Sequence, residues 1–172
     1  MSNNIKYSTN IICSGFIGAN NNSKLIMTSA KELSKRYNTP EESLLKEAKE
    51  KGDPQLIQKL KSFIADCRNP KEGFHLRKTC HLEGKFGHVG IRNTNRCIPG
   101  SKTYYWSIEI FRIMVYFRRI GLGTAIWDTI VESCPHDIIY VESVMTQEME
   151  EFCKSKGCTN MSGNCYYKLL KK

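Results

Sequence analysis

A strand-like apolar run that meets a glycine turn, followed by a helical pattern, constrains the fold of this chain more than any other feature. Residues 113–126 read Ile-Met-Val-Tyr-Phe-Arg-Arg-Ile-Gly-Leu-Gly-Thr-Ala-Ile. Apolar residues then recur at helical spacing until Pro135, which cannot continue a helix. The pattern predicts a strand that turns through two glycines into a helix over residues 122–134.

The glycine turn has the composition of an anion-binding site. Gly121 and Gly123 let backbone N–H groups approach a ligand closely. A helix N-terminus offers unpaired N–H groups and the positive end of its dipole, and Arg118 and Arg119 add two positive charges. These features favour a diphosphate. Two glycines alone describe an ordinary strand–helix turn equally well, and neither the Gly-x-Gly-x-x-Gly pattern nor a Walker A loop is present.

Two segments resemble the GNAT superfamily of acyl-CoA N-acyltransferases. Its consensus, Val-Asp-Pro-x-x-Arg-Gly-x-Gly-x-Gly, aligns with Ile113–Gly123 without a gap. Residues 138–158 resemble that family's fifth strand, fourth helix and Phe-Tyr-x-x-x-Gly-Phe motif, so the resemblance covers residues 103–170. It implies an α/β (α+β) fold in one domain over 1–172. The expected core is a mixed, mostly antiparallel twisted sheet flanked by helices, with a helical segment before the second strand.

The resemblance also implies acetyl-CoA as the acyl donor. By alignment its contacts would be Ile113, Met114, Val115, Arg118, Arg119, Ile120, Gly121, Leu122, Gly123, Thr124, Thr146, Phe152 and Cys153. The chain departs from the family at three of these positions. Arg119 stands where a glycine is usual, Thr146 where an asparagine is common, and Cys153 where many relatives have a tyrosine beside the sulfur.

Acetyl transfer to an amine by direct attack needs a base that removes a proton from the amine. Glu109 is the first candidate, because its apolar neighbours on a strand predicted over residues 102–114 should make its carboxylate more basic. Glu142 is the second candidate. Pairing of either glutamate with Arg92 or Arg112 is an equally good interpretation.

Two further roles have candidates. Backbone N–H groups near Met114 would polarise the thioester carbonyl. Tyr140, Tyr166, Tyr167 or solvent would protonate the departing thiolate, since Cys153 is more simply a space-filling hydrophobe.

The acceptor stays open among a protein N-terminus or lysine, a small amine, an antibiotic and an aminoacyl-tRNA. The departures from the family motif leave a second hypothesis, a catalytically degenerate GNAT-fold binding or structural module. The net charge of +9 permits a third, nucleic-acid binding, but the basic residues are spread along the chain instead of forming one block. We expect a monomer or a homodimer.

Other elements are predicted from local signals. Three short helices should occupy residues 28–67: Thr39 would cap one that starts at Pro40, Gly52 would end it, and Asp53 would cap the next. Strands are expected over residues 11–19, 73–80, 87–92, 138–144 and 165–170.

Two of these predictions concern side-chain orientation and helix ends. Strict alternation along residues 102–114 would place Glu109, Phe111 and Ile113 on one face and Arg112 on the other. Thr146 should cap a helix that Gly157 closes.

The eight cysteines form no Cys-x-x-Cys pair, which predicts reduced, mostly buried thiols in a cytoplasmic protein. His75, Cys80, His81, His88 and Cys97 are zinc-ligand types, but their spacing matches no common zinc module, so no metal is predicted. The apolar stretch over residues 11–19 is too short to span a bilayer, and no membrane association is predicted.

Overall fold

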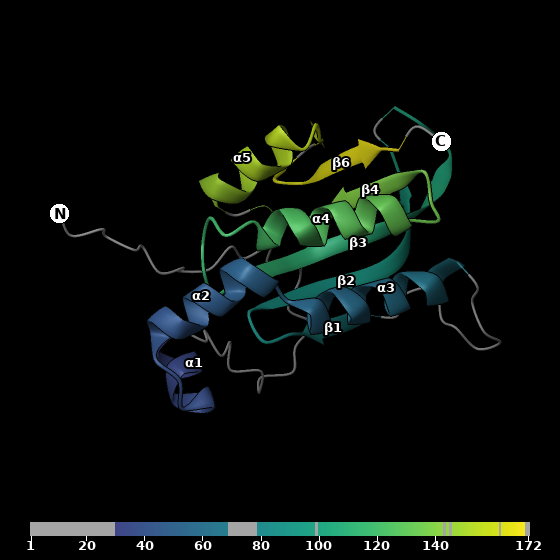
Figure 1. Ribbon diagram of the computed structural model, residues 1–172. Helices are drawn as coiled ribbons and strands as arrows, with labels where there is room; N and C mark the ends of the chain where they lie inside the picture. Colours follow the sequence, from purple (N-terminus) through teal and green to yellow (C-terminus); the bar gives the residue numbers. More distant parts are fainter. Residues whose placement is uncertain are drawn as a thin grey trace, which may run out of the picture.

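The fold is a mixed α/β arrangement. The computed structural model describes residues 30–68, 79–98, 100–142, 144, 146–161 and 163–170. These residues form five helices and one open, mostly antiparallel sheet of six strands (Figure 1). The helices are α1 (Ala30–Tyr37), α2 (Glu41–Lys51), α3 (Pro54–Arg68), α4 (Leu122–Ser133) and α5 (Gln147–Ser155). The strands are β1 (Thr79–Glu83), β2 (Gly87–Cys97), β3 (Tyr104–Val115), β4 (Ile138–Val141), β5 (Thr159–Asn160) and β6 (Tyr166–Leu169), in the sheet order β1-β2-β3-β4-β6-β5.

The predicted helical segment is confirmed as three short helices. Gly52 ends α2 with a φ of 62°, as expected for a residue without a Cβ. The predicted start of α2 is wrong by one residue, because Pro40 occupies the N-cap position and has no side chain that can accept a hydrogen bond. The Thr39 hydroxyl donates to the Tyr37 carbonyl at 2.9 Å instead of capping the helix.

Asp53 joins α3 to the turn between β1 and β2. Its Oδ1 accepts a hydrogen bond from Leu56 N at 3.1 Å, which is the predicted cap. Its Oδ2 accepts a second bond from Phe86 N at 2.6 Å. A Cβ on Gly84 would lie 2.3 Å from that oxygen, so only glycine leaves room for the carboxylate.

Strands β1, β2 and β3 form an antiparallel meander. The predicted end of the second of these strands, at residue 92, is wrong: β2 continues along β3 to Cys97. The strand predicted over residues 73–80 lies mostly outside the described residues, and its described part continues to Glu83. The strand predicted over residues 11–19 also lies outside them.

A β-bulge at Phe111 interrupts the pairing of β2 with β3. Ile91 pairs with Ile110 and the preceding residue, Gly90, pairs with Arg112, so Phe111 has no partner of its own. The Phe111 ring lies across the bare backbone of Gly90, where an added Cβ would meet the ring at 2.4 Å.

The bulge reverses which side chains of β3 share a face. Gly90 and Arg92 are two residues apart in β2 and therefore lie on the same face of the sheet. Paired residues of neighbouring strands share a face, so Arg112, the partner of Gly90, and Glu109, the partner of Arg92, lie on that face as well. The predicted placement of Arg112 opposite Glu109 is wrong, and Ile113 turns away from Glu109. The extra residue changes the parity of every later position in the strand.

The C-terminal half follows its predicted order with two differences. Strand β4 is parallel to β3 but ends at Val141, earlier than the predicted residue 144, and the two-residue β5 was not predicted. The caps of α5 are confirmed: Thr146 Oγ1 accepts from Met149 N at 3.3 Å. Gly157 adopts a φ of 72° at the other end, where it closes the helix.

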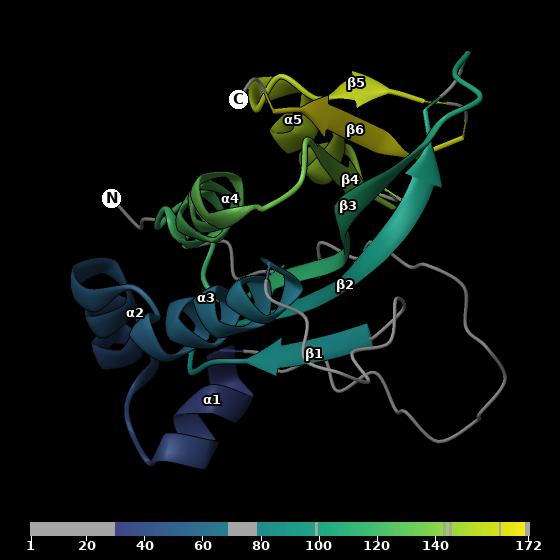
Figure 2. The same cartoon turned by 90° about the vertical axis from the view of Figure 1, so that its right-hand side faces the viewer.

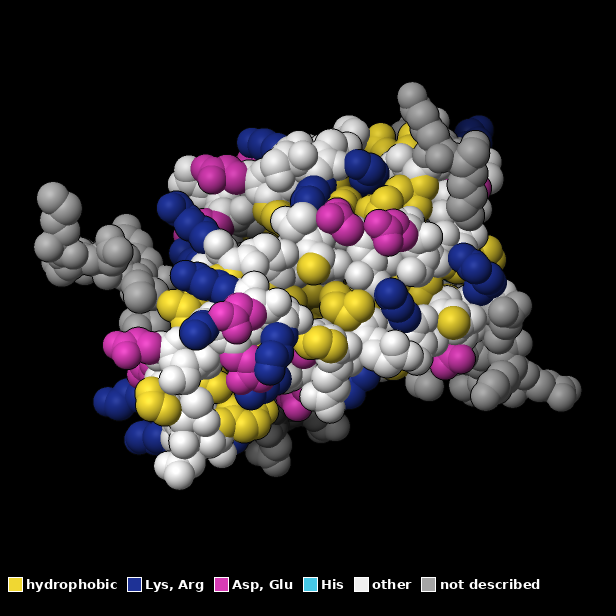
Figure 3. All heavy atoms as spheres, in the orientation of Figure 1, with side chains coloured by type: hydrophobic (Ala, Val, Ile, Leu, Met, Phe, Trp, Pro, Cys, Tyr) yellow, Lys and Arg dark blue, Asp and Glu magenta, His cyan; other side chains and the backbone are white. Residues whose placement is uncertain are grey.

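Helices α3 and α4 cover one face of the sheet, as Figures 1 and 2 show from two directions. Leu122, Ile126 and Ile130 of α4, predicted to share a face, are all buried there. Buried isoleucines of β2, β3 and β4 meet them from the sheet and form the core. On the surface of this side, Lys and Arg side chains stand among Asp and Glu side chains, most densely over α1 and α2 (Figure 3).

No helix in the described part of the chain is long and apolar enough to cross a membrane. No disulfide joins any two of the seven described cysteines. Three of them, Cys67, Cys134 and Cys153, are buried, and the other four are half-buried, so the predicted burial holds for fewer than half.

Candidate functional site

Strands β3 and β4 separate in the middle of the sheet. Their parallel pairing ends at Ile110 and Val141, where Glu142 N donates to Ile110 O at 2.9 Å. Beyond this point β3 continues along β2 as far as Val115. The flank of β3 that faced β4 is therefore no longer paired to it over the last part of the strand.

The direction of the amides on this flank follows from one hydrogen bond. Tyr116 N donates to Phe86 O at 3.0 Å, so the Tyr116 amide faces the β2 side. Backbone amides alternate along a strand, and Met114 therefore also faces β2 while Ile113 and Val115 face the flank that β4 has left. The side chains of Ile113, Met114 and Val115 are buried in the core, so a ligand could meet these residues through their backbone.

The glycine turn leads directly from this flank into α4. Gly121 is the N-cap of α4, with a φ of 82° and no side-chain cap, and the first turn of α4 contains no acidic residue. Among the described residues, no heavy atom lies within 4 Å of a Cβ built on Gly121, and a Cβ on Gly123 would meet only Phe152, at 3.9 Å. The described part of the chain therefore leaves room beside the first turn of α4, where unpaired amides and the positive end of the helix dipole favour an anion.

The two arginines of the turn have different surroundings. Arg118 is half-buried, and its Nη1 lies 3.2 Å from Glu148 Oε1 on α5. Arg119 is exposed and has a φ of 57°, in the left-handed region that favours glycine. Ile120 packs at the edge of the core. Arg119, which stands where the similar motif has a glycine, therefore has a backbone conformation that favours glycine.

The three residues of α5 and its N-cap that were predicted to contact acetyl-CoA, Thr146, Phe152 and Cys153, differ in their exposure to solvent. Phe152 packs edge-on against Trp127 of α4, with ring centroids 5.9 Å apart, and remains half-buried. Thr146 uses its hydroxyl to cap α5. Cys153 is fully buried in the core, which agrees with a space-filling role.

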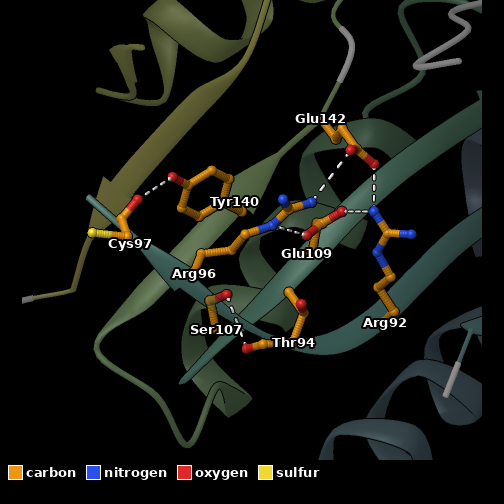
Figure 4. Close-up of polar contacts among 8 residues, drawn as sticks. All are labelled: Arg92, Thr94, Arg96, Cys97, Ser107, Glu109, Tyr140 and Glu142. Atoms are coloured by element: carbon orange, nitrogen blue, oxygen red, sulfur yellow. Dashed lines mark hydrogen bonds and ion pairs between the residues drawn. The ribbon is translucent and has the colours of Figure 1, made fainter. Parts of the chain in front are cut away.

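The carboxylates of Glu109 and Glu142 join two arginines in a four-membered ion-pair network (Figure 4). Arg92 Nη2 bonds to Glu109 Oε1 and lies 2.5 Å from Glu142 Oε2. Arg96 Nε donates to Glu109 Oε2 at 2.8 Å, and its Nη2 donates to Glu142 Oε1 at 3.3 Å. Glu109 is completely buried, whereas the side chains of Glu142, Arg92 and Arg96 are 19%, 27% and 37% exposed.

The two glutamates have opposite electrostatic environments. Burial raises the pKa of Glu109, but hydrogen bonds from Arg96 and Arg92 outweigh it, and the pKa lies below its ordinary value. Burial raises the pKa of Glu142, and the hydrogen bond with Glu109 and its charge raise it further. The prediction that Glu109 is more basic than a carboxylate in water is therefore wrong in direction, because its apolar setting is outweighed by two guanidinium groups.

Tyr140 lies beside the network without joining it. Its hydroxyl donates to Cys97 O at 3.1 Å, and the Arg96 guanidinium lies 5.8 Å from its ring centroid. Burial raises the pKa of Tyr140, which makes its hydroxyl a weaker acid. Tyr166 is buried and Tyr167 half-buried on β6, next to Tyr140 across the β4–β6 pair.

A cavity of about 380 Å³ adjoins the network on the same face of the sheet. Its lining residues are Thr79, Arg92, Thr94, Asn95 and Arg96. A second cavity of about 440 Å³ lies against α5 and includes Thr146 and Asn164 in its lining.

A histidine pair lies on the same face, nearer the bulge. The rings of His81 and His88 stack with centroids 5.4 Å apart, and His81 meets the edge of Phe111. Burial, followed by the charges of His81 and Arg112, lowers the pKa of His88 to about 4. Cys80 lies on the opposite face of β1, and within the described ranges no three His, Cys, Asp or Glu side chains could together hold a metal ion.

Sequence reasoning missed Arg96 because it ended β2 at residue 92. Arg92, Thr94 and Arg96 follow a period of two, which places them on one face of a longer strand. That period was the available signal, but Asn93 and Asn95 weakened the strand pattern between them, because asparagine is depleted in strands.

The sequence was compared with protein-family models, with curated proteins and with solved structures, and none of the three comparisons gives a match. The assignment of a function to this site therefore depends on its geometry and on the motif resemblance.

Proposed function

We propose that this chain is an acetyl-CoA-dependent N-acetyltransferase, a divergent member of the GNAT superfamily. One observation carries the proposal: the flank of β3 released by β4 leads without interruption into a glycine turn and an uncapped helix N-terminus. A ligand with an extended amide-containing arm and a diphosphate matches both parts. The open sheet, mixed and mostly antiparallel, is compatible with the proposal at the level of fold class.

The donor would be held mainly by backbone groups. The N–H groups of Leu122, Gly123 and Thr124 at the start of α4 would bind the diphosphate, and Arg119 would add a charge from solvent. The N–H groups of Ile113 and Val115 would bind the arm and polarise the thioester carbonyl. Acetyl-CoA, when bound, supplies an acetyl group activated as a thioester.

The chemistry would be direct attack by an amine. Glu142, partly exposed and with a raised pKa, would accept a proton from the acceptor ammonium. The amine nitrogen then forms a C–N bond to the carbonyl carbon and loses its second proton to solvent, the C–S bond breaks, and coenzyme A leaves as a thiolate that solvent protonates. Glu109 would hold the two arginines in place. We assign the reaction to the cytoplasm, where cysteines stay reduced, and no disulfide joins the described cysteines to one another.

A binding module without turnover is the second candidate. It is favoured by the buried Cys153 and by the bonded Tyr140 hydroxyl, since neither residue is free to protonate a thiolate. Nucleic-acid binding receives less support, because acidic and basic side chains alternate over the helical side of the molecule (Figure 3).

The first experiment measures acetyl-CoA binding by calorimetry and by thermal shift. Ligand at about 100 times its dissociation constant should stabilise the fold by about 2.7 kcal/mol. Gly123→Val should remove binding because its side chain fills the open space at the turn, while a β-branched residue in place of glycine keeps or raises helix stability. Ala125→Val, on the exposed side of the same helix, is the control and should keep binding.

Three outcomes separate the candidates. Binding with release of thiol in the presence of amines supports the enzyme. Binding without release supports the module. Full binding by the Gly123→Val variant would contradict the placement of the diphosphate.

A further inference from the structure

The cavity beside the ion-pair network is lined by hydrogen-bond donors. The described residues that line it are Arg92, Arg96, Thr79, Thr94 and Asn95; each carries a side-chain hydrogen-bond donor and none of them carries a carboxylate. A volume of about 380 Å³ is at the small end of the range for ligand sites, about 300–1,000 Å³. The cavity therefore suits a small molecule with an anionic group.

Each of the two arginines has N–H donors that the ion-pair network does not use. Arg92 meets both glutamates through Nη2, and Arg96 uses Nε and Nη2. Among the described residues, Nε and Nη1 of Arg92 and Nη1 of Arg96 form no hydrogen bond to the protein. A guanidinium can bind one carboxylate at one edge and a second at another, because its five N–H donors point in different directions.

Glu142 is not part of the lining but lies next to it, because its carboxylate contacts the same two arginines (Figure 4). Its carboxylate is 2.5 Å from Arg92 Nη2 and 3.3 Å from Arg96 Nη2, and it is partly exposed. A molecule that contacts both an arginine and Glu142 must therefore carry a negative and a positive group close together. An α-amino acid has this spacing, with one carbon between its carboxylate and its ammonium group.

We propose that the acceptor is a free α-amino acid, with its carboxylate in the cavity against Arg92 and Arg96 and its ammonium group on Glu142. This inference rests on the proposed function and names its substrate class. The nitrogen loses a proton to Glu142 and forms a C–N bond to the acetyl carbon, the C–S bond breaks, and the products are an N-acetyl amino acid and coenzyme A. A protein lysine, a peptide N-terminus and a polyamine lack the carboxylate that the arginines would bind.

The test offers the full-length chain acetyl-CoA with each common L-amino acid and with the matching α-carboxamide. Product is identified by mass spectrometry and thiol release gives kcat/KM. We expect at least one amino acid to exceed its carboxamide by about tenfold or more, because the carboxamide leaves the arginines without their anionic partner. Aminomethylphosphonate is compared with glycine, and a preference for the phosphonate would overturn the carboxylate assignment.

A substitution outside the ion-pair network tests the position of the substrate carboxylate directly. Thr79 is exposed on β1 and pairs with Arg92, so Thr79→Asp places a competing carboxylate at the cavity. It should lower kcat/KM for the amino acid by about tenfold and leave that for the carboxamide within about twofold. Thr159→Asp, on the exposed strand β5, is the matched control and should change neither.

Different outcomes would contradict the amino-acid substrate and the acetyltransferase function. Equal turnover of amino acids and carboxamides, or better turnover of amines without a carboxylate, would overturn the inference while the enzyme stands. Absence of acetyl-CoA binding would refute the enzyme. In that case, or if no acceptor turns over, calorimetry measures the binding of the amino acid and of its carboxamide to the protein without acetyl-CoA. This comparison tests the cavity assignment independently of turnover. Preference for the carboxylate, lost in Thr79→Asp, supports the cavity assignment, and equal binding overturns it.

Discussion

Glu109 and Glu142 bind the same two arginines from adjacent strands, yet their pKa values move in opposite directions. Glu109 is buried and receives a hydrogen bond from both Arg92 and Arg96, which stabilises its charged form. Glu142 is partly exposed and lies beside the negative charge of Glu109, which disfavours a second charge. One carboxylate is thereby fixed as an anion, and the other is prepared to take up a proton.

Glu142→Gln should lower turnover by about 100-fold or more, because the amide cannot accept the proton of the attacking ammonium. Acetyl-CoA affinity should stay unchanged, since the diphosphate site is formed by α4. Steady-state kinetics and calorimetry measure the two quantities. Glu50→Gln, on the exposed surface of α2, is the control. Unchanged turnover across the pH range would assign proton removal to water.

Glu109→Gln should destabilise the protein by about 3–5 kcal/mol, because it removes the buried one of the two carboxylates that the partly buried guanidinium groups share. Urea unfolding measures the change, and Glu50→Gln should shift it by less than about 1 kcal/mol. Wild-type stability combined with lost turnover would return the role of base to Glu109.

The same residue predicts how stability depends on acid. The pKa of Glu109 is lower in the folded than in the unfolded chain, where it is about 4.3. Its contribution is therefore present above that value and is lost as pH falls through the folded pKa. The Glu109→Gln variant should lack this loss.

His88 should make the protein less stable as pH falls from about 6.5 to about 4. Its pKa is about 4 in the folded chain, so the unfolded chain takes up a proton first and is favoured by it. Unfolding temperatures of wild type and His88→Gln across this range test the effect, and the variant should show a shallower fall. An NMR titration in which every histidine responds near pH 6.5 would contradict it.

Arg119→Gly should raise stability by about 1 kcal/mol, because glycine adopts a φ of 57° without the steric cost that a Cβ imposes. Asn38→Gly is the matched control at a φ of 48°, and its gain should be smaller since asparagine tolerates the left-handed region. Chemical unfolding measures both. A loss of stability in Arg119→Gly would show that the arginine side chain contributes more than the backbone strain costs.

Local signals in the sequence predict the helices of this protein well. Asp53 and Thr146 cap their helices, and Gly52 and Gly157 end theirs, because these effects involve residues only a few positions apart. The limit appears at Thr39, whose hydroxyl donates to the Tyr37 carbonyl instead of capping the helix.

Long-range features were harder to predict. The bulge at Phe111 depends on the bare backbone of Gly90 in another strand, and no signal within residues 102–114 reveals it. The pKa of Glu109 depends on Arg96, which reaches it only because β2 extends to Cys97. The bonding of Tyr140 to Cys97 O is likewise a contact between distant segments. The sequence was sufficient to select Glu109 and Glu142 as candidates, but their opposite pKa shifts depend on contacts made only in the folded protein.

The bulge at Phe111 constrains how the length of this chain can vary in evolution. Deletion of Phe111 itself would leave Ile110 opposite Ile91 and Arg112 opposite Gly90, so Arg112 and Ile113 would keep their faces. Deletion of another residue later in β3, with the bulge kept, would move every following position of the strand to the other face. Natural relatives should therefore differ in the length of this strand only by the bulge residue, and other gains or losses of residues should accumulate in the connections between elements.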